Sequence, residues 1–93
     1  MGAARFPLGR VVATPGALEL LASTGTDPLT LLSRHQSGDW GEVPPEDARE
    51  NELSVREGFR IVSRYCVGED GSKIWLITEA DRSSTCLLLP GEY

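Results

Sequence analysis

Hydrophobic and polar positions divide the chain into a mainly helical part and a strand-like last third. After a short strand-like segment at residues 10–13, rich in β-branched residues, apolar residues up to residue 57 recur at spacings of three and four, as on one face of a helix. From residue 59 onward they form short runs rich in β-branched and aromatic residues, which are typical of strands. This order of elements predicts an α+β domain.

The first two helices are predicted from residues typical of helix ends. Thr14 and Asp27 can each act as an N-cap, and each precedes a proline, which suits the first helical position because its missing N–H would be unpaired there. Gly25 and Gly38 follow at the distance where each helix should end in a left-handed residue. We therefore expect a pair of short helices joined by a tight turn, docked through their leucines.

A third helix is predicted to open at Pro45 and to end at Gly58. Glu46 and Asp47 fall in its first turn, where the helix dipole favours acidic side chains. Its apolar content is thin, so we expect a mostly solvated helix with one weak apolar stripe formed by Ala48, Leu53 and Val55.

Three strand-like runs complete the chain, at residues 59–67, 73–78 and 85–89. The first break contains Asp70-Gly71, a hairpin signal, and the second is a longer polar turn at residues 79–84. The fold predicted is three short helices packed on a three- to four-stranded antiparallel β-meander, with residues 10–13 as the fourth strand. Trp75 and Ile77 share the second face of this sheet, which we consider as a homodimer surface.

Length and charge restrict the classes of partner. A chain of 93 residues with no linker or repeat is expected to be a single domain spanning residues 1–93. Its net charge of −5 disfavours direct binding to nucleic acid and favours a basic protein partner, such as a nucleic-acid-binding protein. The sequence contains no apolar run near the length of a membrane span and no apolar signal segment at its start, so we expect a cytoplasmic protein without membrane contact. Cys66 and Cys86 are expected to be reduced, small hydrophobic residues within strands.

The segment between the second and third predicted helices is the densest mixture of polar, aromatic and glycine residues, and it contains the single histidine. His35 could act as a general base with a nearby carboxylate, or could bind a metal together with Asp39 and Glu46. The structural alternative is a histidine that interacts with the carbonyl end of its own helix. Gly38 interrupts the helix between His35 and Asp39, so their side-by-side placement is not assured.

Trp40 and the polar turn at residues 79–84 are the other candidates. Trp40 is either a plug over the core or an exposed recognition residue. The turn brings together Glu79, Asp81 and Arg82, which can form a binding patch or can simply cap the amides of the turn. No phosphate-binding loop, dinucleotide fingerprint, paired-cysteine motif, zinc-protease motif or nucleophile elbow occurs, and we expect neither a cofactor nor a metal.

Several of these segments together resemble a family of small proteins found on bacterial plasmids, integrative elements and related mobile DNA. The shared features are His35-x-x-Gly38-Asp39-Trp40-Gly41, Glu46-Asp47, Asn51, Gly58-x-Arg60-Ile61-x-Ser63-x-Tyr65, Gly71-x-Lys73-Ile74-Trp75-Leu76-Ile77-Thr78-Glu79-Ala80-Asp81-Arg82 and Leu88-Leu89-Pro90-x-Glu92-Tyr93, preceded by Pro7-Leu8-Gly9-x-Val11-Val12-Ala13-Thr14-Pro15-Gly16-Ala17. The resemblance covers nearly the whole chain. It implies a bacterial mobile element as the setting and carries over no catalytic residue.

Two functional hypotheses follow. The first is a small acidic protein-binding module of a mobile element, which inhibits a host defence or DNA-processing protein by covering its basic surface. Its predicted contact residues are Asp39, Trp40, Glu42, Glu46, Asp47, Glu79, Asp81 and Arg82. The alternative is a small hydrolase or nuclease-like toxin that uses His35 with Asp39, Glu46 or Asp81.

Overall fold

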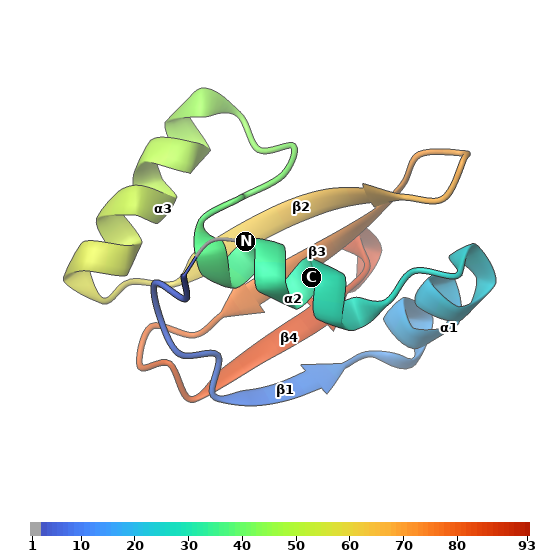
Figure 1. Ribbon diagram of the computed structural model, residues 1–93, viewed down its shortest axis with the longest axis horizontal. Coiled ribbons are helices and arrows are strands. Elements are labelled where there is room, and N and C mark those ends of the chain that lie inside the picture. The colour runs from blue at the N-terminus through green and yellow to red at the C-terminus, as the bar shows by residue number, and fades with distance from the viewer. Residues whose placement is uncertain (1–2) are drawn as a thin grey trace.

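The computed structural model describes residues 3–93 and has the α+β architecture expected, with three helices and a four-stranded sheet (Figure 1). Met1 and Gly2, the beginning of the stretch considered for a signal segment, lie outside the described residues. No helix within residues 3–93 has the length and apolar character needed to cross a membrane. In chain order, the elements are β1 (Arg10–Ala13), α1 (Pro15–Thr24), α2 (Pro28–Ser37), α3 (Pro45–Glu57), β2 (Ile61–Val67), β3 (Ser72–Thr78), β4 (Ser84–Leu88) and a final 3₁₀ turn, η1 (Pro90–Glu92).

The helix ends follow the local signals in the sequence. The Thr14 side chain accepts a hydrogen bond from the backbone N–H of Ala17, and Asp27 accepts one from Leu29, so both N-caps form as predicted. The three helices end at Gly25, Gly38 and Gly58, whose φ angles of 65°, 94° and 82° are left-handed. These ends were predictable because capping depends only on neighbours within one helical turn.

The strand order in the sheet is β1-β4-β3-β2, and one strand runs in an unexpected direction. β2, β3 and β4 form the antiparallel meander, whereas β1 pairs with β4 in parallel. The prediction of a wholly antiparallel sheet is therefore wrong for β1. The backbone N–H of Arg10 donates to the carbonyl of Ser83, just before β4, so both strands start at the same end of the sheet. Nothing in the alternation of apolar residues along four positions encodes that choice.

Figure 1 shows α2 lying across one face of the sheet and α3 standing beside β2. The main core lies beneath α1 and α2 and consists of Ala17, Leu21, Leu31, Leu32, Tyr65, Val67, Ile74, Leu76 and Leu87. A second cluster joins the N-terminal segment to the loop before α3 through Phe6, Trp40 and Ile61. Burying the apolar surface of such side chains contributes about 25 cal/mol per Å², so these clusters are the main stabilising contacts.

α3 docks through polar residues as well as through part of the weak apolar stripe predicted for it: Ala48 and Val55 pack against the second cluster, whereas the prediction is wrong for Leu53. The buried side chains of α3 are Asn51 and Ser54, while Leu53 is 41% exposed. The Asn51 amide donates to the carbonyl of Val62 at 2.8 Å and accepts from the N–H of Val62 at 3.1 Å. The side chain therefore pairs with β2 as a neighbouring strand would, and it attaches α3 to the sheet while leaving Leu53 free.

The two cysteines differ in environment. Cys86 is half-buried, and burial raises the pKa of its thiol. Cys66 is exposed on the outer face of the sheet, next to Lys73 and Glu42. The expectation that both would be hydrophobic packing residues is wrong for Cys66, because its strand position points outward near the end of the β2–β3 hairpin.

Candidate functional site

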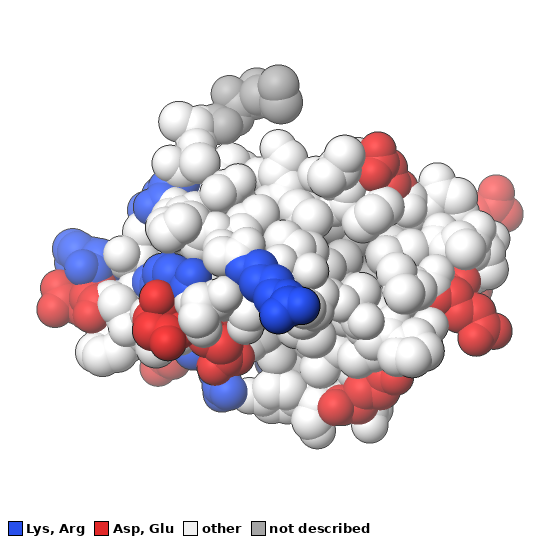
Figure 2. All heavy atoms as spheres, turned by 90° about the horizontal axis from the view of Figure 1, so that it is seen from below, with Lys and Arg blue, Asp and Glu red and all other residues white. Residues whose placement is uncertain are grey.

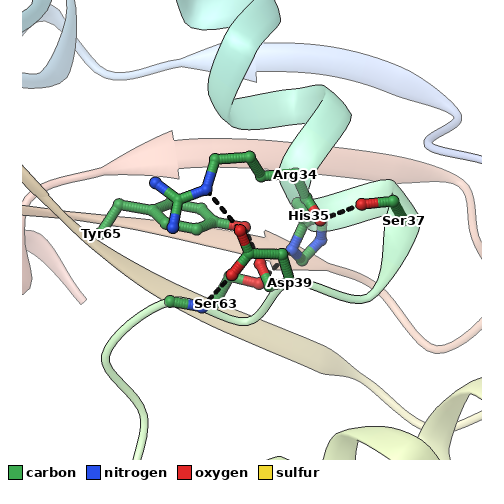
Figure 3. A network of polar contacts seen from close by, with 7 residues as sticks. Arg34, His35, Ser37, Asp39, Ser63 and Tyr65 are labelled. Atoms are coloured by element: carbon green, nitrogen blue, oxygen red, sulfur yellow. Dashed lines mark hydrogen bonds and ion pairs between the residues drawn. The ribbon is translucent and has the colours of Figure 1, made fainter. Parts of the chain in front are cut away.

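His35 is completely buried beneath α2 and is bonded on both ring nitrogens. Figure 3 shows its ring beside Ser63. Nδ1 lies 2.5 Å from Oγ of Ser63 on β2, and Nε2 lies 2.8 Å from Oγ1 of Thr78 on β3. Thr78 is in turn bonded to Thr85 on β4, at 2.7 Å between the two hydroxyl oxygens. One imidazole thus links α2 to three adjacent strands of the sheet.

The donor and acceptor of each hydrogen bond in the series from His35 through Thr78 to Thr85 can be assigned by starting at Thr85. Thr85 donates its hydroxyl proton to the carbonyl of Leu8, so it must accept from Thr78, which then accepts from His35. His35 is therefore the Nε2–H tautomer, and its bare Nδ1 accepts from Ser63. Burial lowers the pKa of His35 from 6.5 to about 4, so the ring is neutral near pH 7.

The carboxylates proposed as partners of His35 are occupied elsewhere or exposed. Asp39 binds Nε of Arg34 at 2.7 Å, and this guanidinium lowers the pKa of the Asp39 carboxyl (Figure 3). Asp81 accepts from the backbone N–H of Ser83, and Glu46 is exposed in the first turn of α3. Within residues 3–93, no three His, Cys, Asp or Glu side chains are grouped so that they could hold a metal ion.

The loop of residues 38–42 is a clasp that closes the second core cluster. Trp40 is only 6% exposed, stacks on Phe6 with 6.2 Å between ring centroids, and donates its indole N–H to Glu52. Gly41 has a φ of 75°, and a Cβ at this position would overlap the carbonyl of Arg64. Of the two predictions for Trp40, the plug over the core is confirmed, because the loop runs against β2 and turns the indole inward, and the exposed recognition residue is wrong.

The turn at residues 79–84 is a second clasp, in which Arg82 is the central residue. Its guanidinium donates to the carbonyls of Phe59 and Ser54, each at 2.7 Å, and thereby joins the end of α3 to the turn. Arg82 has a φ of 60°, the one positive value at a non-glycine residue within the described chain. Such a conformation is costly and persists here because the bonds of Arg82 hold it. The hydrogen-bond donors of the Arg82 guanidinium are thus used by backbone carbonyls of the protein itself.

An open cleft of about 560 Å³ lies between α3, the outer face of β2 and β3, and the C-terminal residues. Its apolar wall is formed by Val43, Leu53, Phe59, Val62, Trp75 and Tyr93. Phe59 is 54% exposed and Tyr93 is 62% exposed, although both are large and apolar enough to favour burial. Leu53, Phe59 and Tyr93 thus present exposed apolar surface at one cleft, as interaction sites often do.

Charged residues surround this patch in pairs of opposite sign. Asp47 and Glu50 line the α3 side of the cleft, and Arg60 and Arg64 line the β2 side. The Arg64 guanidinium lies 4.8 Å from the Trp75 ring centroid and 3.7 Å from the Asp47 carboxylate. Its Nε is buried without a hydrogen-bond partner among the described residues.

The cleft and the predicted contact residues overlap only in part. Of the predicted set, Asp47 lines the cleft, Glu46 is exposed in the same turn of α3, and Glu42 is exposed on the sheet beside Lys73. The remaining members belong to the two clasps: Asp39, Trp40, Glu79, Asp81 and Arg82. The aromatic and arginine residues of the cleft were missed because they come from separate segments. The only local sequence feature that pointed to the cleft was Trp75 on the second, partly apolar face of the predicted sheet.

Comparison with known proteins provides no family assignment. No family model, no curated protein and no solved structure matches the chain.

Proposed function

We propose that this protein is a small acidic protein-binding module that docks on a basic protein through the cleft beside α3. The observation that carries the proposal is the exposed apolar surface of Leu53, Phe59 and Tyr93 at an open cleft with an acidic side. Aromatic and arginine residues with apolar neighbours are the types that dominate binding energy at protein interfaces.

Charge supports a basic partner. α3 carries five acidic and two basic residues, and the chain as a whole has a net charge of −5. Within the cleft, Asp47 and Glu50 offset Arg60 and Arg64, so the acidic field comes from the rest of α3 and of the chain. A basic partner would therefore approach an attractive field and would meet an apolar anchor site at the cleft.

The resemblance to proteins of plasmids and related mobile DNA supports our proposal that the partner is a bacterial protein. Inhibition of a host defence or DNA-processing protein is the use we propose, because such proteins present basic surfaces that bind phosphate backbones. An acidic module seated on that surface would compete with the nucleic acid for the same lysine and arginine side chains.

The hydrolase or nuclease alternative receives no support from the placement of its residues. His35 is closed off from solvent, and its two nitrogens are bonded to Ser63 and Thr78. A general base must reach the proton that it removes, which would here require opening of the main core. We therefore propose no reaction at His35.

The test is affinity capture from nuclease-treated bacterial lysate with three baits: the wild-type chain, Phe59→Ser and Leu29→Ser. Leu29 is the matched control because it is 70% exposed on α2 and does not line the cleft. We expect a basic protein that saturates the wild-type and Leu29→Ser baits and is lost from Phe59→Ser. Equal capture by both variants, or capture of acidic proteins alone, would contradict the proposal.

A purified complex then provides the stricter measurement. Titration of the captured protein with the module should release its bound nucleic acid, and Phe59→Ser should fail to do so at the same concentration. If the complex forms but nucleic acid stays bound, docking is retained and the inhibitory role is refuted. Circular dichroism of each variant establishes that the fold is intact.

A further inference from the structure

The sheet has one closed edge and one open edge. At the β2 edge, Asn51 bonds both backbone groups of Val62, and Arg64 pairs with the backbone of Trp40 and Glu42. The β1 edge has no such cover, and Val11 and Val12 are 45% and 41% exposed. Figure 2 looks onto this edge: its middle is largely uncharged apart from one basic side chain, and acidic side chains gather toward the right-hand end.

The backbone groups on the free side of β1 follow from its pairing with β4. Arg10 donates to Ser83 and Thr14 donates to Leu87, so alternate residues from position 10 face β4. The N–H and C=O groups of Val11 and Ala13 therefore point away from the sheet. Within residues 3–93, no hydrogen bond occupies these four groups, which form a template for another strand.

We propose that a second copy of this chain occupies the β1 edge, as an antiparallel β1–β1 pair with its two-fold axis at Val12. In this register, Val11 of each copy lies opposite Ala13 of the other, and every free N–H and C=O of the two residues is paired. Four hydrogen bonds then join two sheets into one continuous eight-stranded sheet. The interface is isologous, as is usual for dimers, and it covers the exposed side chains of Val11 and Val12.

Charge complementarity selects a second copy over an unrelated peptide. Arg10 lies in no ion pair within the described chain, and the proposed register sets it opposite Thr14 of the second copy. Thr14 donates its hydroxyl proton to Glu92 at 2.6 Å, so that carboxylate stands beside the same position. Arg10, Val12 and Thr14 share the sheet face of Cys86, away from the helices. The register that pairs the backbone thus also brings Arg10 to Glu92, twice in each dimer.

The first experiment is light scattering of the full chain from about 10 μM to about 1 mM, because a dimer of this kind must dissociate on dilution. We expect the mass to rise toward twice the 10.1 kDa of one chain. Val12→Lys should stay monomeric over this range, since it places two lysines against each other on the axis. Leu29→Lys, an exposed apolar position on α2, should dimerise as the wild type does.

A charge exchange tests the register itself. Arg10→Glu should weaken association by about tenfold or more, and the double variant Arg10→Glu with Glu92→Lys should recover it. The amides of Val11 and Ala13 should exchange more slowly with solvent as the concentration rises. A wild-type chain that is monomeric at the highest concentration, or a dimer unaffected by Val12→Lys, would overturn the proposal. Val12 and Arg10 do not line the cleft, so a failure of this dimer would not contradict the proposed binding of a basic partner, which the capture experiment tests separately.

Discussion

At the scale of single residues, the chemistry that stands out in the sequence serves the core. His35 and Trp40 are both buried, and each polar atom on their rings has a partner. Buried polar groups cost free energy unless they are bonded, and a fully bonded set favours one arrangement of the elements that contribute to it. Here that arrangement is α2 over three strands, and the loop of residues 38–42 against β2.

The buried imidazole should make stability depend on pH. The pKa of His35 is about 4 in the folded chain and 6.5 when the side chain is exposed, so the unfolded chain takes up a proton first as pH falls. The contribution of the neutral ring to the free energy of unfolding is therefore complete above pH 6.5 and is lost as pH falls toward 4. Between pH 7 and pH 4.5 the free energy of unfolding should fall by about 2 kcal/mol from this group. Urea denaturation of the wild type and of His35→Gln measures it. The variant should lack this decline, and equal slopes would contradict the assignment.

Trp40 should behave as a core residue. Trp40→Ala should lower the free energy of unfolding by about 3–5 kcal/mol, because it removes a large buried ring from the second cluster. Trp40→Phe retains most of the packing and loses the bond to Glu52, so we expect a loss of about 1 kcal/mol. Denaturant unfolding measures both. A small effect of Trp40→Ala, similar to that of Phe59→Ala at an exposed ring, would mean that Trp40 is not in the core.

At the scale of elements, α3 explains why a cleft exists. The helix is attached to the sheet by Asn51 and Ser54, and its end is held by Arg82. Leu53 therefore remains on the open side, facing the cleft together with Phe59. An amphipathic helix with leucines toward the sheet would have packed closer and filled this space.

The Asn51 contact can be divided into its donor and acceptor parts. Asn51→Asp keeps an acceptor for the N–H of Val62 but loses the donor to its carbonyl, whereas Asn51→Leu loses both. We expect both variants to be less stable by about 1–3 kcal/mol. Hydrogen exchange measured by NMR should distinguish them, with the Val62 amide protected in Asn51→Asp and exposed in Asn51→Leu. Equal protection in both would show that Asn51 does not close the β2 edge.

At the scale of the whole molecule, charge and shape act together in the proposed function. The chain is acidic, and five of the seven large apolar residues exposed within residues 3–93 lie at the cleft or on β1, the other two being Leu18 and Leu29. Long-range attraction sets the rate at which a basic partner arrives, while the apolar anchors set the rate at which it leaves. The two contributions should therefore separate in kinetic measurements.

Varying the salt concentration should separate the electrostatic contribution to association from the apolar contribution to dissociation. For the captured basic partner, raising ionic strength should reduce the association rate steeply and change the dissociation rate little, because surface charges are screened over about 10 Å at 0.1 M salt. Glu50→Gln should reduce the salt dependence of association, whereas Phe59→Ser should mainly speed dissociation. Stopped-flow or surface-based kinetics would measure both. An association rate that does not respond to salt would refute the electrostatic part of the proposal.

The sequence by itself determined the helix ends, the three strands of the meander and the α+β class. These features depend on neighbours along the chain: a cap at Thr14 or Asp27, a left-handed glycine, and runs of β-branched residues. Even within helices, periodicity alone was less reliable. Leu31 and Leu32 are buried as expected, but Leu18 is 55% exposed.

Only the tertiary structure decided the direction of β1, the burial of His35 and Trp40, and the existence of the cleft. Each depends on groups that are far apart in the sequence: Arg10 with Ser83, His35 with Ser63 and Thr78, and α3 with the C-terminal Tyr93. A local pattern records whether a residue favours burial, but not which distant hydroxyl or carbonyl will meet it. The same polar residue can therefore be read as a reactive group from the sequence and yet, once the strands assemble around it, hold the core together.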